Sequence, residues 1–456
     1  MKQSKYDKMT IGYENDLVEN LRKFVRIASV YSEETRSKEH PFGIRVTDAL
    51  NFICELARKD GFKVTNYDNM VAEIIVGDEY TKNVTIMAHA DVVPEGEGWD
   101  QNPYEMKEKD GTFYGRGVAD DKGPLLSAYY GMKALKDNNL IKGYHVRFLV
   151  GGNEESGSLG MIHYFHDLKK KQPDFGFSPD SAYPLTYGEK GIIGFEAKTK
   201  VNLPEVYSID GGLAHNAVIE KCVVEMVKDE RFVYTLKRKG VHFTLKELED
   251  RYVITFIGKS AHGSIPWMGA NAGLIALDML GQHYHNEELI HAHKCFSGTK
   301  GEGVGANAYS PDMYDNSLCV GFVKLHNGEL KLSINFRYVN TVTEEEMIKA
   351  FVKNSKPMEI KVLGTSPLLF YPTNSLLIST LMHAYQEESG DYKTKPLTSG
   401  GGTYAKEADN VVAFGMELPG YDSYMHAPGE RVERSNLVKS MAIYARAIEE
   451  LGEKLK

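Results

Sequence analysis

The spacing of apolar residues predicts an α/β arrangement in the first part of the chain. Apolar side chains recur at helical spacing in two early segments, 15–27 and 46–56, where each set would form one helix face. Short runs rich in apolar and β-branched residues alternate with further helical patterns. These runs predict strands over 63–65, 71–76, 83–89 and 144–150, and helices over 122–136 and 159–168. Because strands alternate with helices, we expect a mainly parallel sheet flanked by helices.

The pattern changes near Lys190 and returns to its first form near Ser375. The middle segment predicts more antiparallel strands over 192–201, 232–236, 252–258 and 329–337, with helices over 216–228 and 270–283. The last segment predicts a helix from 376, a strand over 411–414 and a final helix over 435–451. We therefore expect a two-domain α/β protein. A discontinuous first domain, 1–188 plus 374–456, would be interrupted by an inserted α+β domain, 189–373.

Composition and charge narrow the possible partners. The 456 residues are 42% hydrophobic and 26% charged, which is typical of a globular protein, and the net charge is −9. Because no basic stripe accompanies that charge, we expect neither nucleic acid nor an anionic membrane as a partner. The N-terminus lacks the apolar core of a signal peptide, no apolar run is long enough to span a bilayer, and the four cysteines are widely separated. These features predict a cytoplasmic protein with reduced, buried thiols.

Imidazole and carboxylate side chains follow several of the predicted strands. His89 and Asp91 lie at the end of one strand, and Glu154 and Glu155 follow another. Open α/β sheets place ligands at the carboxyl ends of their strands, and divalent metals take nitrogen and oxygen donors from several such ends. Asp120 comes after a glycine-rich turn and at the start of a helix. Together with the distant His426, these residues predict a shared metal site.

Each of these features also has an ordinary structural interpretation. An isolated His-x-Asp is more often structural, and an Asp at a helix start is commonly a cap. Adjacent glutamates such as Glu154 and Glu155 are by default part of a solvated loop, although the buried character of the preceding strand weakens that interpretation. The metal-site hypothesis therefore depends on the whole set of residues.

The order and spacing of these motifs resemble the M20 family of co-catalytic metallopeptidases. The resemblance rests on 89–94, Trp99, Pro103, 110–117, Asp120, Lys122, Gly123 and the pair Glu154-Glu155, and it extends to His426. Within the family, the chain is most similar to bacterial dipeptidases of the PepV type. That similarity rests on the large insertion and on the motifs 120–124, 178–180, 188–191 and 400–405.

The resemblance implies a centre for two divalent metal ions, zinc or manganese. Asp120 would bridge the ions, with His89 and Asp180 completing one site. Glu155 and His426 would complete the other. Glu154 would be the general base, and Asp91 would orient His89.

The resemblance also assigns roles in the inserted domain, which would act as a lid over the substrate. His262, in the motif 258–266, would stabilise the oxyanion, and Arg337 would bind the free carboxylate of the substrate. We expect three further residues to line the substrate site, namely Asn216, Gly402 and Thr403. Outside the family context, Arg337 is equally well explained as a surface or strand-edge arginine.

The activity implied by the resemblance is hydrolysis of dipeptides, and an Asp at position 180 favours that substrate class. One alternative is an N-acyl amino acid deacylase or desuccinylase with the same metals and mechanism. Another is a non-catalytic peptide-binding protein that kept the fold. Because an enlarged lid replaces surface that smaller relatives obtain by dimerising, we expect a monomer.

Overall fold

The computed structural model describes residues 3–456 and divides them into two compact units. The first unit contains 3–188, Leu369–Thr398 and Thr403–Lys456. The second contains Glu189–Leu368 together with the short segment Ser399–Gly402. A loop from the C-terminal part of the chain is therefore built into the second unit.

The sheet of the first unit is parallel at its centre and antiparallel at its edges. Its central strands are β6 (His145–Gly151), β3 (Asn83–His89), β7 (Phe175–Ser178) and β22 (Val411–Ala413), in that order. The neighbouring strands are β1 (Lys63–Tyr67) and β2 (Val71–Val76) on one side, and β9 (Thr186–Glu189), β20 (Leu369–Phe370) and β21 (Leu397–Ser399) on the other. Both β3 and β6 are buried along their whole length, as expected of strands covered on both faces.

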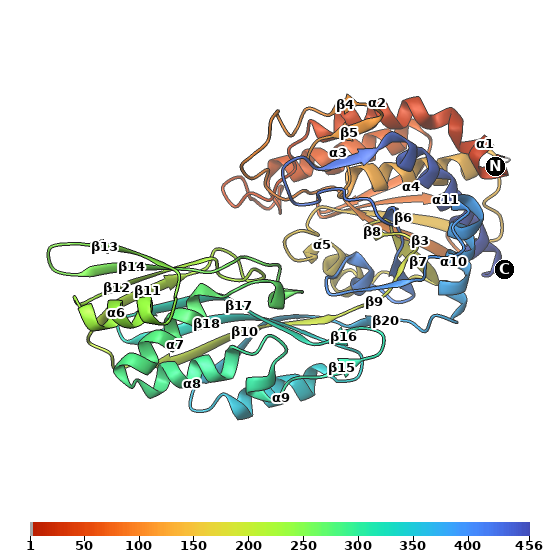
Figure 1. The fold of residues 1–456 in the computed structure, drawn as a ribbon. Helices are drawn as coiled ribbons and strands as arrows, with labels where there is room; N and C mark the ends of the chain where they lie inside the picture. The colour runs from red at the N-terminus through yellow and green to blue at the C-terminus, as the bar shows by residue number, and fades with distance from the viewer. Residues whose placement is uncertain (1–2) are drawn as a thin grey trace. The chain divides into compact units, whose positions relative to one another are not determined.

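Helices cover this sheet, and two of them approach each other closely. The helices are α1 (Lys5–Thr10), α2 (Glu14–Val25), α3 (Ile44–Lys59), α4 (Lys122–Asp137), α5 (Leu159–Ile162), α10 (Leu376–Ser389) and α11 (Arg434–Glu453) (Figure 1). Helix α11 packs along α4 and α10, and both α4 and α11 contact β3. At Gly131 of α4 a Cβ atom would lie 2.8 Å from the Met441 carbonyl oxygen of α11, so only glycine permits this approach.

Small sheets connect loops that are far apart in sequence. Strand β24 (Arg431–Glu433) pairs with β5 (Thr112–Tyr114), which pairs with β4 (Lys107–Lys109). Likewise β23 (Met416–Glu417) pairs with β8 (Ser181–Ala182). The first sheet brings the segment after His426 against the segment before Asp120. The second brings the C-terminal part of the chain next to Asp180.

The second unit is built on an antiparallel sheet with helices packed against it. The strands, in spatial order, are β13 (Phe243–Glu247), β14 (Tyr252–Ile257), β12 (Lys221–Met226), β11 (Val206–Gly211), β17 (Ser317–His326), β18 (Glu329–Tyr338), β10 (Gly191–Lys200) and β19 (Glu359–Ser366). Helix α7 (Ala272–Tyr284) packs on β11, β12, β14 and β17, and α8 (Glu287–Phe296) lies beside α7 (Figure 1). Further elements of this unit are α6 (Glu230–Arg238), α9 (Glu344–Asn354) and the pair of short strands β15 (Tyr309–Ser310) and β16 (Tyr314–Asp315). The predicted fold class, an α/β protein interrupted by an α+β domain, is confirmed.

Two secondary-structure predictions in the second unit were wrong. The segment 232–236 is not a strand but part of α6, in which Phe232, Val233 and Leu236 are buried at helical spacing and the Asp229 carboxylate caps the helix start. The segment 216–228 is not a helix, because it contains β12, where buried Cys222, Val224 and Met226 alternate with less buried residues. In both segments the apolar run is short enough to fit either the helical or the strand period.

Two further predictions concern the thiols and the membrane. All four cysteines are unpaired and buried, as predicted. Among the described residues, no helix is both long enough and apolar enough to cross a membrane.

Candidate metal centre

The carboxyl ends of three neighbouring strands bring predicted ligands together. His89 ends β3 and lies opposite Gly151, the last residue of β6, so the loop carrying Glu154 and Glu155 starts beside the imidazole. Strand β7 ends at Ser178, two residues before Asp180. Since parallel strands end at the same edge of the sheet, residues far apart in sequence meet there.

The five predicted ligands form two groups that share Asp120. His89, Asp120 and Asp180 form one group, and Asp120, Glu155 and His426 form the other, with the candidate ligand atoms of each group within 4.8 Å of one another. The His89 Nε2 atom lies 3.0 Å from Asp120 Oδ1 and 3.8 Å from Asp180 Oδ2. The His426 Nε2 atom lies 2.8 Å from Asp120 Oδ2 and 3.3 Å from Glu155 Oε2. The two oxygens of Asp120 therefore face different groups.

The donors of these groups fit divalent metal ions. Imidazole nitrogens and carboxylate oxygens are the ligands that zinc takes in mixed sites, and manganese accepts the same oxygen-rich set. The Glu155 Oε1 atom is buried and has no hydrogen-bond partner within 3–456, as expected of an oxygen whose partner would be an ion. The residues present are thus suited to two ions that share Asp120.

Burial and mutual repulsion shift the pKa values of the acidic groups. Burial, followed by repulsion from Asp180, raises the pKa of Glu154 well above its usual range. Burial and repulsion from Asp120 likewise raise the pKa of Glu155. For Asp120 burial acts in the same direction, but hydrogen bonds from His426 and His89 outweigh it and lower the pKa. The result is a concentration of negative charge that a cation would relieve.

The two histidines gain proton affinity from the same carboxylates. Hydrogen bonds to Asp120 and Glu155 raise the pKa of His426 to about 11. Burial opposes the charged form of His89, but hydrogen bonds to Asp120 and Asp91 outweigh it and raise its pKa. Divalent ions and protons would therefore compete for these imidazoles.

Asp91 contacts both His89 and the acidic loop. The His89 Nδ1–H group donates to the backbone carbonyl of Asp91 at 3.0 Å, which leaves Nε2 facing Asp120, whereas the Asp91 carboxylate lies 3.4 Å from Nδ1. The two carboxylate oxygens of Asp91 accept hydrogen bonds from the backbone N–H groups of Glu154 and Glu155, each at 3.1 Å. The side chain thus holds the acidic loop in addition to lying beside His89.

A buried ion pair beneath Asp120 received no role in the sequence analysis. Glu430 Oε1 accepts hydrogen bonds from the backbone N–H groups of Gly117, Ala119 and Asp120, and Oε2 pairs with Arg116 Nη1 at 2.7 Å. Burial raises the pKa of Glu430 to about 7. Because Glu430 follows His426 by four residues, it ties the His426 loop to the turn that carries Asp120. In the sequence, Glu430 is a glutamate shortly after a candidate ligand, and it fits the family resemblance.

Asp121 is a second buried acid that sequence reasoning did not identify. One of its oxygens accepts a hydrogen bond from the backbone N–H of His89 at 3.1 Å, and the other has no hydrogen-bond partner among the described residues. Burial raises its pKa well above the usual range. In the sequence it is one of two adjacent aspartates, and nothing in the local pattern distinguishes it from a solvated residue.

The residues predicted to contact substrate lie mainly in the second unit, where two of them are neighbours. Asn216 and His262 are brought together by a backbone bridge between Ala217 and His262, and the Gly263 N–H donates to the Asn216 carbonyl at 2.6 Å. The imidazole Nδ1 of His262 lies 2.6 Å from the Ser264 hydroxyl. Asn216 precedes β12 in an irregular segment rather than in the predicted helix.

Arg337 lies in the same unit, next to the glycine-rich loop. Its guanidinium is buried on β18, where Nε donates to Asn335 Oδ1 at 2.9 Å and Nη1 donates to the Gly400 carbonyl at 2.5 Å. A Cβ atom at Gly400 would lie 2.8 Å from the Ser264 side chain, so this loop also contacts the His262 segment. Gly402 ends the loop in the second unit, whereas Thr403 belongs to the first unit.

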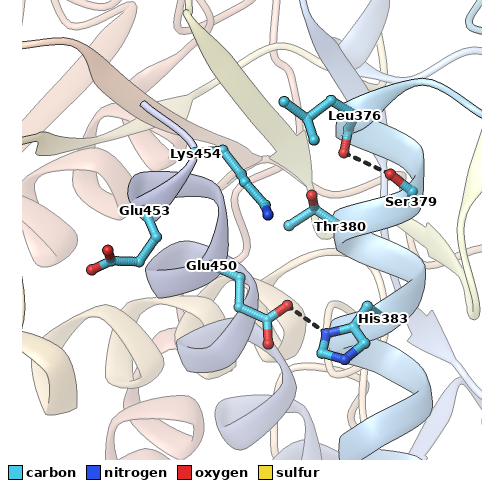
Figure 2. Close-up of a pocket in the computed structure, with 7 residues that line it drawn as sticks. All are labelled: Leu376, Ser379, Thr380, His383, Glu450, Glu453 and Lys454. Atoms are coloured by element: carbon cyan, nitrogen blue, oxygen red, sulfur yellow. Dashed lines mark hydrogen bonds and ion pairs between the residues drawn. The ribbon is translucent and has the colours of Figure 1, made fainter. Parts of the chain in front are cut away.

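A surface pocket elsewhere in the first unit contains none of the predicted site residues. It lies between α10 and α11, has a volume of about 370 Å³ and is lined by Leu376, Ser379, Thr380, His383, Glu450, Glu453 and Lys454 (Figure 2). His383 Nδ1 and Glu450 are 2.8 Å apart across it. An ordinary surface ion pair explains this contact.

Comparison with known proteins identifies a matching family and relatives that align with this chain over nearly its whole length. Residues 85–450 match the model of "Peptidase family M20/M25/M40". The chain is 32% identical to YtjP of Bacillus subtilis (strain 168), which carries the name of a candidate dipeptidase, over 97% of this chain and 98% of that protein. The match thus covers both units and the insertion.

Two solved structures share the fold. A dipeptidase of Saccharomyces cerevisiae, Dug1p, is 18% identical with a TM-score of 0.60, and the match covers 98% of both chains. YXEP of Bacillus subtilis, described as a dinuclear metal-binding peptidase from the M20 family, is 11% identical with a TM-score of 0.53, and the match covers 97% of this chain and 99% of that one. At these identities the likeness concerns the fold.

The Glu430 ion pair yields a prediction about stability. Glu430→Ala removes the counter-ion of buried Arg116 and the acceptor of three backbone amides, and breaking a buried pair in this way costs about 3 kcal/mol. We expect a loss of that size in the free energy of unfolding, measured by denaturant titration. Glu433→Ala, the same change at a residue whose side chain accepts a hydrogen bond from the Ser435 hydroxyl, is the control. Equal losses in both variants would contradict the prediction.

Proposed function

Because the chain belongs to peptidase family M20/M25/M40 and is a metallopeptidase of that family, we propose that it hydrolyses dipeptides with two bound divalent ions, zinc or manganese. The single observation that carries the proposal is the pair of ligand groups sharing Asp120. His89 and Asp180 would hold one ion with Asp120, and Glu155 and His426 would hold the other. When bound, such a pair of ions polarises the scissile carbonyl and increases the acidity of water.

Glu154 is the proposed general base. Its carboxyl group interacts electrostatically with Asp180, His89, Glu155 and Asp120, yet it belongs to neither ligand group. Burial raises its pKa, which increases its affinity for a proton taken from the attacking water. Glu154 then delivers that proton to the leaving amine. Asp91 orients His89 through its carbonyl and fixes the backbone of Glu154 through its carboxylate.

Most of the proposed substrate-binding groups belong to the second unit, and Thr403 belongs to the first. Arg337 binds the free carboxylate of the dipeptide, since a planar guanidinium offers paired donors to a carboxylate. His262 donates a hydrogen bond to the oxyanion, and Asn216, Gly402 and Thr403 line the substrate site. The neighbouring positions of Asn216 and His262, and of Arg337 and the 399–402 loop, support this grouping. The names of the relatives support a dipeptide as substrate.

The reaction is tested with chelator-stripped protein and a panel of unblocked dipeptides. We expect no turnover without metal and restored turnover when zinc or manganese is added back singly, because the ligand groups require an ion for function. N-acetylated dipeptides and N-acyl amino acids are assayed alongside. Turnover of the acylated compounds alone would indicate a deacylase or desuccinylase, and dipeptide binding without turnover under every metal would indicate a binding protein; either result contradicts the proposal. Light scattering of the same sample tests the expected monomer.

The general-base assignment predicts different results for two adjacent glutamates. Glu154→Gln removes the base without removing a ligand, so the metal content should persist while kcat falls by about 10²–10⁴-fold. Glu155→Gln, the same change one residue later, should lower the metal content because it removes a ligand. Metal analysis and steady-state kinetics of both variants check this expectation. Most of the turnover remaining in Glu154→Gln would exclude it as the base.

The proposed role of Arg337 predicts an effect on substrate affinity. Arg337→Lys keeps the positive charge but loses the planar pair of donors, whereas Arg337→Ala loses both. We therefore expect KM for dipeptides to rise by about 10–100-fold in the alanine variant and by less in the lysine variant. Arg251→Ala, at a half-buried arginine of the same unit that pairs with Glu225, is the matched control. KM values are measured by steady-state kinetics. An unchanged KM in folded Arg337→Ala would remove Arg337 from this role.

A further inference from the structure

Tyr404 is a fully buried residue that lies behind the metal centre. It begins a short 3-10 turn, Tyr404–Glu407, whose start is capped by the Thr403 hydroxyl accepting from the Ala405 N–H at 3.2 Å. This turn contacts β3 and β7, the strands that end before the predicted ligands His89 and Asp180. The phenol therefore comes from a distant part of the sequence but reaches the ligand edge of the sheet.

The hydroxyl of Tyr404 holds the start of the acidic loop. It accepts a hydrogen bond from the backbone N–H of Asn153 at 3.2 Å. A Cβ atom at Gly151 would lie 2.3 Å from the same oxygen, so only a glycine lets the end of β6 approach the phenol this closely. The backbone between these two residues is thus fixed against the tyrosine.

The contact to Asn153 is transmitted along the loop. The Asn153 side chain donates to the Ser156 hydroxyl at 2.5 Å and accepts from the Leu159 N–H at 2.8 Å, which closes the loop onto α5. Three successive backbone N–H groups are consequently held by side chains from elsewhere in the chain. Asn153 donates to Tyr404, and the next two residues, Glu154 and Glu155, donate to Asp91.

The ring of Tyr404 also contacts the first predicted ligand. It meets the His89 imidazole edge to face, with ring centroids 6.2 Å apart and an interplanar angle of 87°. Since His89 Nδ1 already donates to the Asp91 carbonyl, the ring contact limits rotation of the imidazole from a second direction. One side chain thus touches both the His89 ring and the loop that carries the proposed base.

We propose that Tyr404 is a positioning residue that fixes the Glu154–Glu155 loop relative to His89, through its hydroxyl and its ring. The inference rests on the proposed function: on the two bound ions for its effect on metal affinity, and on dipeptide hydrolysis for its kinetic consequence. Groups that orient metal ligands in this way typically change metal affinity or activity by about 10–100-fold when they are lost. Ordinary core packing, the alternative, would make the hydroxyl dispensable.

The chain offers a matched control for the hydroxyl. Tyr144 is also buried in the same unit, but its hydroxyl has no hydrogen-bond partner in the part of the chain that the structure describes, and its ring packs against Gly452. Tyr404→Phe and Tyr144→Phe each delete one buried oxygen and keep the ring. Thermal unfolding of both variants tests whether a difference between them in metal affinity or kcat reflects a difference in global stability.

The experiment titrates chelator-stripped wild type and both variants with manganese or zinc by calorimetry, then measures kcat and KM with a dipeptide. For Tyr404→Phe we expect an affinity for the weaker ion, and a kcat, lower by about 10–100-fold, with KM unchanged. Tyr144→Phe should match the wild type. Unchanged metal affinity and kcat in Tyr404→Phe, or equal losses in both variants, would overturn the inference. If the wild type binds metal without hydrolysing dipeptides, the proposed function fails while the metal titration still decides the role of Tyr404.

Discussion

The constraint on which the rest of the first unit depends is the repulsion among carboxyl groups buried at one edge of the sheet. The charges of Asp180, Glu155 and Asp120 add to burial in raising the pKa of Glu154, and the charge of Asp120 adds to burial in raising the pKa of Glu155. Burying like charges is unfavourable unless donors or cations compensate them. The structure supplies the histidines as partners, and the donor set leaves two groups of ligands suited to divalent ions.

Behind the ligands, backbone amides and the buried Arg116 guanidinium compensate the charges of two further carboxylates. The Glu430 carboxylate accepts from three amides around Asp120 and pairs with Arg116, and the Asp91 carboxylate accepts from the two amides of the acidic loop. Each of these acids joins segments that are distant in sequence. The supporting acids therefore fix ligand geometry by the hydrogen bonds that also make their own burial tolerable.

The second unit organises its polar groups by a different device. Its antiparallel sheet holds Arg337 on β18, and a loop from the C-terminal part of the chain returns to contact that guanidinium through Gly400. The absence of a side chain at Gly400 lets the loop approach Ser264, two residues after His262. Arg337, Gly402 and the His262 segment are thus connected within one unit although they are spread over much of the sequence.

The sequence by itself predicted the alternation of strands and helices, the inserted domain and, through its family resemblance, the candidate residues of the ligand groups. Periods of apolar residues are set locally, and His89, Asp120 and Glu155 lie in motifs with distinctive spacing. The sequence patterns predicted the wrong element for 216–228 and 232–236. Short apolar runs fit both the helical and the strand period, and packing in the folded protein selects one of them. Only the tertiary structure decided that Asp91 holds the acidic loop, that Glu430 pairs with Arg116 and that Tyr404 reaches Asn153. The physical reason is that each of these contacts joins segments that are far apart in sequence, so no local pattern predicts it. The contacts gain their strength from burial in the folded protein.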